Sequence, residues 1–315
     1  MKAVVLRADD RFEPVERPVP VPGPGEVLVR VEYAGVQWGD VLVRGGHFPV
    51  PRPFVPGFEA AGRIEAVGAG VPADRVGERV LALLQGGGYA EFAVLPAVLA
   101  VPAEGVDARS AAAFGWVGPT AYDLVETVTR VRPGDRVLIH AATGGVGTLA
   151  AQFAAAAGAG RIVGVVGGPG QEDYARGFGY HAVLTRDAFP DALAGEEFDV
   201  VLDPVGGPTR TANLALLAPH GRLAVYGNLA TFDPVRVDAN ALLMKGQSLL
   251  AYNSNLLSRT DPGRLAAGAA RALARLAEGT VRVDVTAEYP LADTGTAIDA
   301  LAAGGHRGKS VVRIG

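Results

Sequence analysis

A glycine-rich turn between an apolar strand and an alanine-rich helix is the part of the sequence whose residues most clearly indicate chemistry. The strand covers 136–140 and the helix 148–157. Between them, Ala142, Gly144 and Gly147 follow the spacing of a phosphate-binding fingerprint, with alanine at its first glycine position. Gly144 would let backbone approach a pyrophosphate, and Gly147 would let the helix pack against the strand. The free N–H groups and the positive end of the helix dipole would then face the anion. We predict a dinucleotide site, with a plain structural turn as the alternative. The groups predicted to hold the pyrophosphate are the backbone N–H groups of Thr143, Gly144, Gly145 and Val146.

The composition limits what other chemistry is expected. The 315 residues are enough for two domains, and 49% are hydrophobic, which is typical of a globular protein. The net charge is −4 and no basic run occurs, so neither nucleic acid nor an anionic membrane is an expected partner. Without cysteine, disulfides, thiolate catalysis and cysteine-bound zinc are excluded. No apolar run reaches membrane-spanning length, and residues 1–7 resemble a first strand rather than a signal segment, which predicts a cytoplasmic protein.

Two kinds of pattern divide the chain. Residues 1–115 are rich in Val, Gly and Pro, and their short alternating runs predict a β-rich, partly barrel-like domain. After Thr120, strands and helices alternate, which predicts a parallel sheet with helices on both faces. The alternation ends near Leu249. An amphipathic helix at 263–279 and a strand at 310–314 follow, and we expect them to return to the first domain because the nucleotide sheet is complete without them. The predicted domains are 1–118, 119–252 and 253–315, the last completing the first.

The elements expected within these domains follow from hydrophobic periodicity and turn residues. Strands are expected at 27–33, 61–67, 89–95, 136–140, 161–166, 182–185, 198–202 and 222–226. Helices are expected at 120–129, 148–157, 171–177 and 208–217.

Four motifs, in register along nearly the whole chain, are similar to those of a known family. They are Gly35-Val-Gln-Trp-Gly-Asp40 with Arg44-Gly-Gly-His-Phe-Pro49; Pro56-Gly-Phe-Glu-Ala-Ala-Gly62; Ala141-Ala-Thr-Gly-Gly-Val-Gly147; and Asp199-Val-Val-Leu-Asp-Pro-Val-Gly-Gly207 followed by Gly221-Arg-Leu-Ala-Val-Tyr-Gly-Asn228. In these motifs the chain resembles the zinc-free quinone oxidoreductase branch of the medium-chain dehydrogenase/reductase superfamily, which includes zeta-crystallin-like proteins. The resemblance implies an α/β fold, with a GroES-like β-rich catalytic domain, a Rossmann domain with a doubly wound parallel sheet, and an active site between them.

The resemblance also implies catalysis without a metal. In zinc-dependent relatives a cysteine stands at the position of Gln37 and a histidine at that of Phe58, so both ligands are replaced here. A lobe with four cysteines is absent as well. The remaining histidines outside the motifs show no ligand spacing, and we take them as structural or exposed. They are His140, His181, His220 and His306.

The end of the strand at 161–166 indicates which nicotinamide cofactor is favoured. A site for NAD places an acidic residue near this strand end, where it accepts a hydrogen bond from the ribose 2′-OH. The strand here runs into Gly167, and no acidic residue occurs before Glu172, so a 2′-phosphate would meet no carboxylate. We therefore favour NADPH and keep NADH open. The family pattern implies Lys at the position of Gln171 and Tyr at that of Arg186. Arg186 could still clamp the phosphate, the alternative being a solvated surface arginine.

A second group of residues is predicted to face the nicotinamide. Residues 226–228 follow a strand, at the end where ligands bind in open α/β sheets; strand packing with a turn is the alternative. Thr120 is predicted to reach the nicotinamide ribose or carboxamide, unless it is only an N-cap. Tyr252 and Asn253 follow an apolar run near the domain boundary, and they either line the cleft or pack. The cofactor contacts predicted on this side are Thr120, Tyr226, Gly227, Asn228 and Asn253.

The catalytic candidates are fewer. Gln37 takes the place of an Asn common in quinone reductases and could bond the ribose or the substrate carbonyl, whereas we expect Asp40 to order its loop. Phe48 stands where related enoyl reductases often carry Tyr as a candidate proton donor, and Phe cannot donate. A needed proton would then come from His47, from Tyr252 or from solvent. For His47 an exposed loop histidine without a role is the alternative.

The leading hypothesis is a zinc-independent, NAD(P)H-dependent oxidoreductase that transfers hydride to a quinone or an α,β-unsaturated carbonyl compound. A quinone needs less help from an acid than a thioester does, which favours quinones and enones. The alternative from another class is an NADP(H)-binding structural or regulatory protein without physiological turnover. An alcohol dehydrogenase is disfavoured by the missing zinc ligands. The resemblance implies a homodimer, formed through edge strands of the Rossmann sheet.

Overall fold

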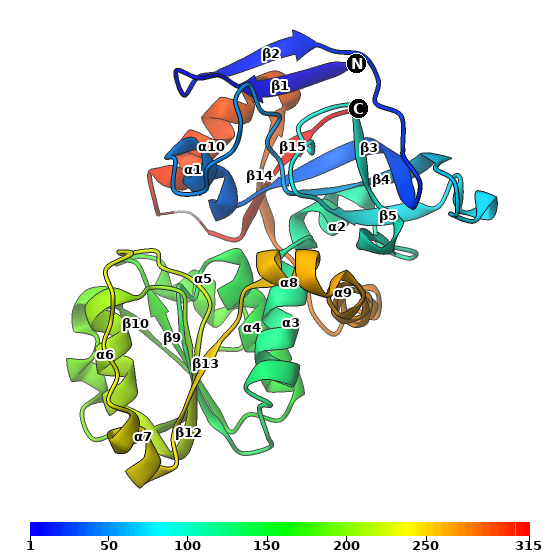
Figure 1. Cartoon of the computed structure of the whole chain (residues 1–315). Helices are drawn as coiled ribbons and strands as arrows, with labels where there is room; N and C mark the ends of the chain where they lie inside the picture. The colour runs from blue at the N-terminus through cyan, green and yellow to red at the C-terminus, as the bar shows by residue number, and fades with distance from the viewer. Residues whose placement is uncertain (306) are drawn as a thin grey trace. The chain divides into compact units, whose positions relative to one another are not determined.

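The chain forms two compact units (Figure 1). The computed structural model describes residues 1–305 and 307–315, so His306 lies outside the described residues. The predicted boundaries were 118/119 and 252/253, and in the structure the units meet along the chain at 119/120 and 254/255. The last segment belongs to the same unit as the first. Unit 1 comprises Met1–Pro119 and Asn255–Gly315, and unit 2, coloured green to yellow in Figure 1, comprises Thr120–Ser254.

Unit 1 is built around a seven-stranded sheet, in which the long strand β3 (Glu26–Val36) pairs with three others. The other strands of this sheet are β4 (Glu59–Val67), β5 (Arg79–Leu83), β6 (Phe92–Pro96), β7 (Ala100–Pro102), β14 (Val285–Pro290) and β15 (Lys309–Arg313). β3 pairs antiparallel with β4, β6 and β15, and its residues Val27, Val29 and Val31 are buried, as β-branched residues in a central strand should be. β1 (Lys2–Leu6) and β2 (Phe12–Glu16) form a separate antiparallel pair.

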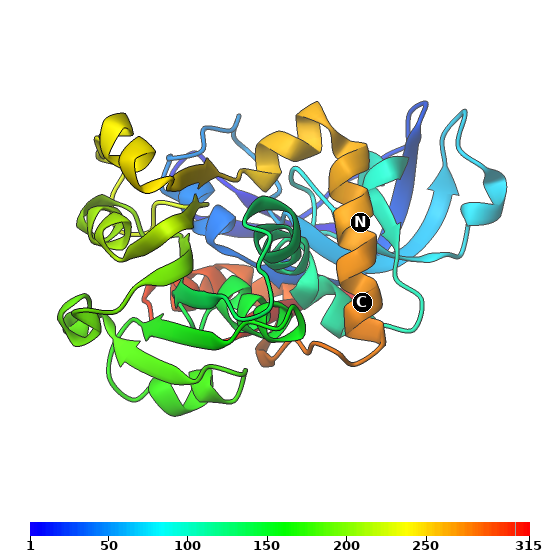
Figure 2. The ribbon, with the colours of Figure 1, turned by 90° about the horizontal axis from the view of Figure 1, so that it is seen from below.

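The longest helix of unit 1 is α9 (Pro262–Ala277), which Figure 2 shows in orange as one uninterrupted helix. The Asp261 side chain accepts a hydrogen bond from the backbone N–H of Arg264, and Pro262 is at the first turn, so both residues favour a helix start here. Its buried residues recur at helical spacing and face β7 and the 3-10 turn Ala97–Leu99. The other helices of this unit are α1 (Trp38–Arg44), α2 (Ala108–Phe114), α8 (Ser254–Thr260) and α10 (Thr294–Ala302).

Unit 2 contains a six-stranded, fully parallel sheet. Its strands are β8 (Arg136–His140), β9 (Arg161–Val166), β10 (Ala182–Thr185), β11 (Phe198–Asp203), β12 (Leu217–Val225) and β13 (Ser248–Ala251). The order is β10-β9-β8-β11-β12-β13, so the strand order reverses between β8 and β11. This is the doubly wound arrangement in which ligands bind beyond the carboxyl ends of the strands at the reversal point. The predicted fold class, a GroES-like β-rich domain with a Rossmann domain, is confirmed.

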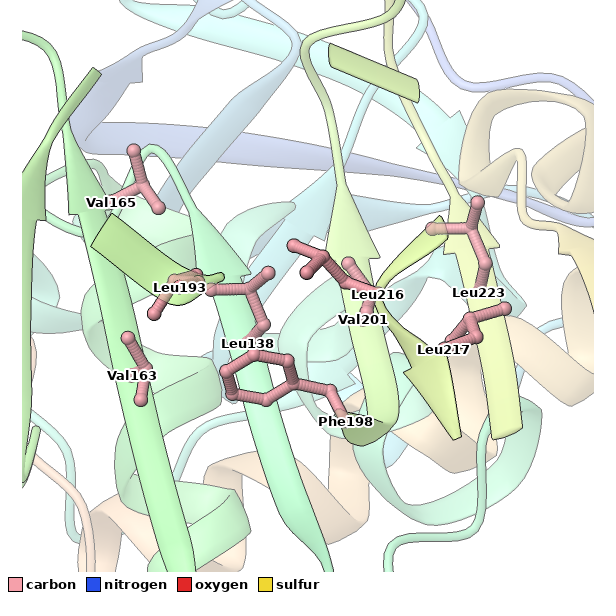
Figure 3. Packing of buried hydrophobic residues seen from close by; sticks show 9 residues of the cluster. All are labelled: Leu138, Val163, Val165, Leu193, Phe198, Val201, Leu216, Leu217 and Leu223. Carbon is pink, nitrogen blue, oxygen red and sulfur yellow. The ribbon is translucent and has the colours of Figure 1, made fainter. Parts of the chain in front are cut away.

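Helices of unit 2 alternate with these strands, and side chains from both sheet and loops fill its core. The helices are α4 (Gly145–Ala156), α5 (Glu172–Arg176), α6 (Gly207–Ala215) and α7 (Ala239–Lys245); α3 (Val117–Tyr122) enters the unit and continues as a π-helical stretch, Asp123–Val128. Figure 3 shows one cluster of the core. Its members are Leu138, Val163, Val165, Leu193, Phe198, Val201, Leu216, Leu217 and Leu223.

The last strand of the sheet was not among the predicted elements. The alternation ends near Leu249, as expected, but no strand was expected there, and in the structure β13 forms the sixth strand and pairs with β12. β13 is short and its residues are only partly buried, so it lacks the apolar signal of the central strands. The predicted strand at 222–226 is also longer than expected, because β12 begins at Leu217.

Candidate functional site

The turn between β8 and α4 is formed by two glycines that do different things. α4 begins at Gly145, with Gly144 as its N-cap. A Cβ built on Gly147 would lie 2.4 Å from the Ala141 carbonyl oxygen and 2.9 Å from the Ala142 Cα, so only glycine lets the helix pack this closely on the turn. A Cβ on Gly144 would meet a single atom within 4 Å, the Ala141 oxygen at 3.3 Å. Gly147 is therefore needed by the fold, whereas a Cβ on Gly144 would make one tight backbone contact and would otherwise stand clear of the neighbouring atoms at the helix N-terminus.

Gln171 joins the turn after β8 to the turn after β9. Its Oε1 accepts a hydrogen bond from the Gly167 N–H at 3.2 Å and faces the Thr143 hydroxyl at 3.5 Å. Thr143, Gly167 and Gln171, all predicted from the sequence to contact the cofactor, thus come together at the carboxyl ends of adjacent strands. Arg186 is exposed in a 3-10 turn after β10, and its guanidinium makes no hydrogen bond or ion pair within the described residues.

The carboxyl ends of β11 and β12 are tied by an ion pair that sequence reasoning missed. Asp203, fully buried, accepts from the Arg210 Nε at 3.0 Å. The same guanidinium donates to the Gly227 carbonyl oxygen at 2.8 Å and to the Asn228 Oδ1 at 3.3 Å. Burial and the nearby Asp203 raise the pKa of Tyr226. The signal that could have revealed the pair is an acid at a strand end followed by an arginine within the next helix.

Asp203 also holds the turn that precedes α6. Its Oδ1 accepts from the backbone N–H groups of Val205 at 2.7 Å and Gly206 at 3.0 Å. The carboxylate therefore fixes the turn after β11 while Arg210 fixes the turn after β12. Predicted cofactor residues Gly227 and Asn228 lie on the second of these turns.

Tyr252 lies at the end of β13 and its hydroxyl is already engaged. It donates to the Asp123 Oδ2 at 2.8 Å, and both side chains are buried. Thr120 is buried in the interior of α3, so it is not an N-cap, and its hydroxyl lies 3.5 Å from that of Ser254. Asn253 is exposed.

The predicted catalytic residues of unit 1 surround α1. Gln37 is its half-buried N-cap, between the end of β3 and the helix. His47 and Phe48 are exposed on the loop that follows, and their backbone N–H groups donate to the Leu42 carbonyl oxygen at 2.9 and 3.2 Å. The loop is thus held through its backbone, with both side chains at the surface.

Asp40 orders the loops around α1, as expected. Its Oδ2 accepts from the Gln37 N–H at 3.0 Å and from the Tyr89 hydroxyl at 2.8 Å, and its Oδ1 accepts from the Gly57 N–H at 3.2 Å. The carboxyl is buried, and this burial raises its pKa to about 7 despite the three hydrogen bonds.

A second buried charge pair, absent from the sequence reasoning, lies in the same unit. The Lys309 Nζ is 2.5 Å from the Glu59 Oε1 and donates to the Val36 carbonyl oxygen at 2.6 Å. Glu59 also accepts from the Trp116 N–H at 2.5 Å. Burial raises the pKa of Glu59, and Lys309 opposes this rise. The partners are 250 residues apart, so no local pattern could have indicated the pair.

Other structural features bear on the candidate site. Among residues 1–305 and 307–315, no group of three or more His, Cys, Asp or Glu could hold a metal ion, and no helix is long and apolar enough to cross a membrane. His140 is buried at the end of β8, where its Nε2 lies 2.7 Å from the Asn213 Oδ1; burial lowers its pKa. Two surface cavities, of about 540 and about 700 Å³, are lined by none of the predicted site residues.

Two family profiles match the chain: an alcohol dehydrogenase GroES-like domain over residues 23–105 and a zinc-binding dehydrogenase domain over residues 145–264. A quinone oxidoreductase of Pseudomonas aeruginosa is 34% identical, and the match covers 96% of this chain and 93% of that protein. A 2-haloacrylate reductase of a Burkholderia species is 35% identical over 84% of this chain and 85% of the reductase.

Larger proteins match as well. A mycocerosic acid synthase-like polyketide synthase of Mycolicibacterium smegmatis is 33% identical over 93% of this chain, and the match spans only 14% of the synthase. Among solved structures, the quinone oxidoreductase from Thermus thermophilus, described together with its NADPH complex, has a TM-score of 0.84 and 34% identity, with all of both chains covered.

Proposed function

This chain belongs to the quinone oxidoreductase branch of the medium-chain dehydrogenase/reductase superfamily, and from that premise we propose that it transfers hydride from NADPH to a quinone or an α,β-unsaturated carbonyl compound. The observation that carries the proposal is that Gly144, the N-cap of α4, places no side chain in front of the helix N-terminus. A pyrophosphate can approach the backbone N–H groups there, while Gly147 keeps α4 packed on the turn. The residues present therefore fit the cofactor.

The chain's own residues orient the reactants and stabilise developing charge. When bound, NADPH supplies the hydride from its nicotinamide C4. A quinone that takes up one hydride and one proton becomes a hydroquinone, and an enone takes up hydride at its β-carbon and a proton at its α-carbon. In both reactions negative charge grows on a carbonyl oxygen. We assign the side-chain amide of Gln37 as the group that donates a hydrogen bond to that oxygen.

The proton comes from solvent or from His47 in this proposal. Phe48 has no proton to donate, and the Tyr252 hydroxyl already donates to Asp123. His47 is exposed, so it can exchange protons with water. A quinone suits such a site because its anion is delocalised and needs no strong acid.

NADPH is proposed over NADH because of the segment after β9. No acidic residue lies between Gly167 and Gln171, and Arg186 is exposed on the next turn along the sheet edge. A 2′-phosphate would thus meet no carboxylate there and could pair with a guanidinium. Catalysis without zinc is proposed because Gln37 and Phe58 stand at the positions of two zinc ligands.

Anaerobic turnover with NADPH and a panel of quinones, enones and enoyl thioesters tests the function. We expect the highest kcat/KM with quinones or enones and no loss of activity after chelation. The thioesters are included because of the polyketide synthase relatives. Failure to oxidise NADPH with every member of the panel would refute the proposal, and loss of activity on chelation would favour a zinc-dependent dehydrogenase.

The alternative, NADP(H) binding without turnover, is supported by the engaged Tyr252 hydroxyl and by Phe48. Titration of NADPH fluorescence separates the two functions. Tight binding without hydride loss to any acceptor would establish the alternative, and tight binding with turnover would exclude it.

We also propose a homodimer formed through β13. This edge strand pairs with β12 on one side, and α7 just before it exposes Leu243 (76%) and Met244 (83%). An open strand edge beside apolar side chains suits pairing with an identical edge, which a two-fold axis provides. Sedimentation should give a dimer for the wild type and a monomer for Leu243→Asp/Met244→Asp. A wild-type monomer at micromolar concentration would contradict the proposal.

A further inference from the structure

One peptide unit in unit 1 is bonded at both of its polar atoms to buried ionisable side chains. This is the peptide between Val36 and Gln37. Its carbonyl oxygen accepts from the Lys309 Nζ at 2.6 Å, and its N–H donates to the Asp40 Oδ2 at 3.0 Å. The bond from the Lys309 ammonium is charge-assisted and stronger than a neutral one, and the Asp40 carboxyl holds the opposite side, so the peptide plane is fixed from both sides. We propose that Asp40 and Lys309 are positioning residues that clamp the backbone carrying Gln37. The inference rests on the proposed function, in which the side-chain amide of Gln37 donates a hydrogen bond to the substrate carbonyl.

The lysine end of the clamp has little freedom to move. Glu59 holds Lys309 at 2.5 Å, and the Trp116 N–H holds Glu59. A Cβ on Gly35 or on Gly115 would lie 2.4 Å from an atom of Glu59, so backbone encloses the carboxylate on two sides. A buried ion pair adds little net stability compared with apolar residues of the same volume. Its presence directly behind the Gln37 peptide is therefore better explained by the bond from Lys309 to Val36.

The aspartate end of the clamp joins two loops. Tyr89, fully buried, donates to the same Asp40 oxygen that receives the Gln37 N–H. The other oxygen receives the N–H of Gly57, which directly precedes Phe58. Gln37 and Phe58 occupy the two zinc-ligand positions of the zinc-dependent relatives. In this chain one carboxylate ties together the two segments that carry them.

Ionisable groups around Asp40 make its titration a useful readout. Tyr89 from the segment before β6 contacts it, and Glu59 of β4 lies nearby with Lys309 of β15 beyond. Burial places the pKa of Asp40 at about 7, within the range of an activity assay. An inflection of kcat that belongs to Asp40 must disappear in Asp40→Asn.

A double-mutant cycle with Gln37→Ala tests the proposal. We expect Asp40→Ala to lower kcat about 10- to 100-fold, because small misplacements of a catalytic group have effects of this size. The NADPH Kd should change less than about twofold, and Asp40→Asn, which can keep an oxygen on the Gln37 N–H, should recover most of kcat. In the Gln37→Ala background, Asp40→Ala should add less than about twofold, since a positioning residue acts through Gln37. An equal loss in both backgrounds would overturn the proposal.

The lysine end is tested by Glu59→Gln/Lys309→Met, which avoids an uncompensated buried charge. It should lower kcat as Asp40→Ala does. Ile64→Ala is the matched control, because it removes a buried side chain from β4 without touching the clamp. It should lower Tm and leave kcat within about twofold. If kcat falls equally in the control at equal loss of Tm, the network has only a structural role.

Hydrogen exchange decides the clamp independently of activity. Hydrogen exchange at the backbone N–H of Gln37 should be at least about tenfold faster in Asp40→Ala than in Ile64→Ala. If the wild type turned over nothing in the substrate panel, the proposed function would fail and this measurement would still judge the clamp. Equal exchange in the two variants would reject it.

Discussion

The two units shape their proposed functional loops by opposite means. In unit 2, the turn after β8 depends on side chains that are absent, since Gly147 leaves room for α4 against backbone. In unit 1, the turn after β3 depends on side chains that are present, since Asp40 and Lys309 hold one peptide from both ends. The first loop is made by sequence neighbours. The second brings together groups as far apart as Glu59 and Lys309, 250 residues along the chain.

This difference teaches where each loop should be vulnerable. A loop shaped by glycines contains positions that serve the fold and positions that serve the ligand, and substitutions should separate the two. A loop shaped by a charge network has partners that depend on one another, and their substitutions should be non-additive. The predictions below test whether the two loops behave in these different ways.

The largest effect is expected for Lys309→Met. The variant leaves Glu59 buried without its counter-charge, which should lower the free energy of unfolding by about 3–5 kcal/mol. Glu59→Gln/Lys309→Met removes both charges and should cost less than Lys309→Met alone. Urea denaturation of the wild type, Lys309→Met, Glu59→Gln and the double variant measures this. If the double variant loses the sum of the two single losses, the pair is not coupled and the comparison fails for unit 1.

The next largest effect is expected for Gly147→Ala in unit 2. The added Cβ would meet backbone atoms of Ala141 and Ala142, which cannot rotate away, so the free energy of unfolding should fall by about 2–3 kcal/mol. Gly168→Ala is the matched control, because a Cβ there meets nothing within 4 Å. That control should stay within about 0.5 kcal/mol of the wild type. Comparable losses in both variants would show that clearance at Gly147 is not what holds α4.

The same contrast explains what could be predicted from the sequence. The strands at 161–166 and 182–185 coincide with β9 and β10, because short apolar runs bounded by glycine or polar residues are local signals. The glycine turn and the Rossmann architecture follow from equally local spacing. β13 was missed because an edge strand with half its residues exposed carries little of that signal.

Side-chain partners could not be predicted in the same way. The Tyr252 hydroxyl was considered as a proton donor, and in the structure it donates to Asp123, 129 residues away in the sequence. Asp123 begins the π-helical stretch after α3 and Tyr252 follows β13, so the pairing depends on the tertiary fold, which no local residue pattern records. The ion pair of Asp203 with Arg210 was closer to prediction, since Asp203 directly follows the strand predicted at 198–202 and Arg210 lies in the first turn of the helix predicted at 208–217. The roles of Gln37, His47 and the cofactor contacts remain predictions.

The charge of Asp40 should make the stability of unit 1 depend on pH. The folded protein holds this proton up to about pH 7, whereas the unfolded chain releases it near the ordinary value of 3.8. Between pH 5 and 7 the folded state therefore binds more protons than the unfolded state. As the pH rises from 5 to 7, the wild type should lose on the order of 2 kcal/mol of stability relative to Asp40→Asn. Above about pH 7 the difference should be constant. Chemical denaturation of both proteins across pH 5–8 measures it, and parallel curves would contradict the assignment.

The smallest expected change in free energy concerns Gly144→Ala, and it sharpens the comparison most. Gly144 has φ −76° and ψ 167°, which alanine adopts readily, and its Cβ would meet only the Ala141 oxygen at 3.3 Å. The Ala141 carbonyl would have to move by a few tenths of an ångström, so stability should fall by less than in Gly147→Ala, where the clash with backbone is closer. The methyl group would stand in front of the N–H groups that a pyrophosphate must approach, so the NADPH Kd should rise at least about tenfold, or about 1.4 kcal/mol. Fluorescence titration measures the affinity, with Gly168→Ala again as the control. Unchanged affinity in Gly144→Ala, with the fold intact, would mean that the cofactor does not approach this turn. The claim that the glycine turn of unit 2 has one position for the fold and another for the ligand would then be wrong.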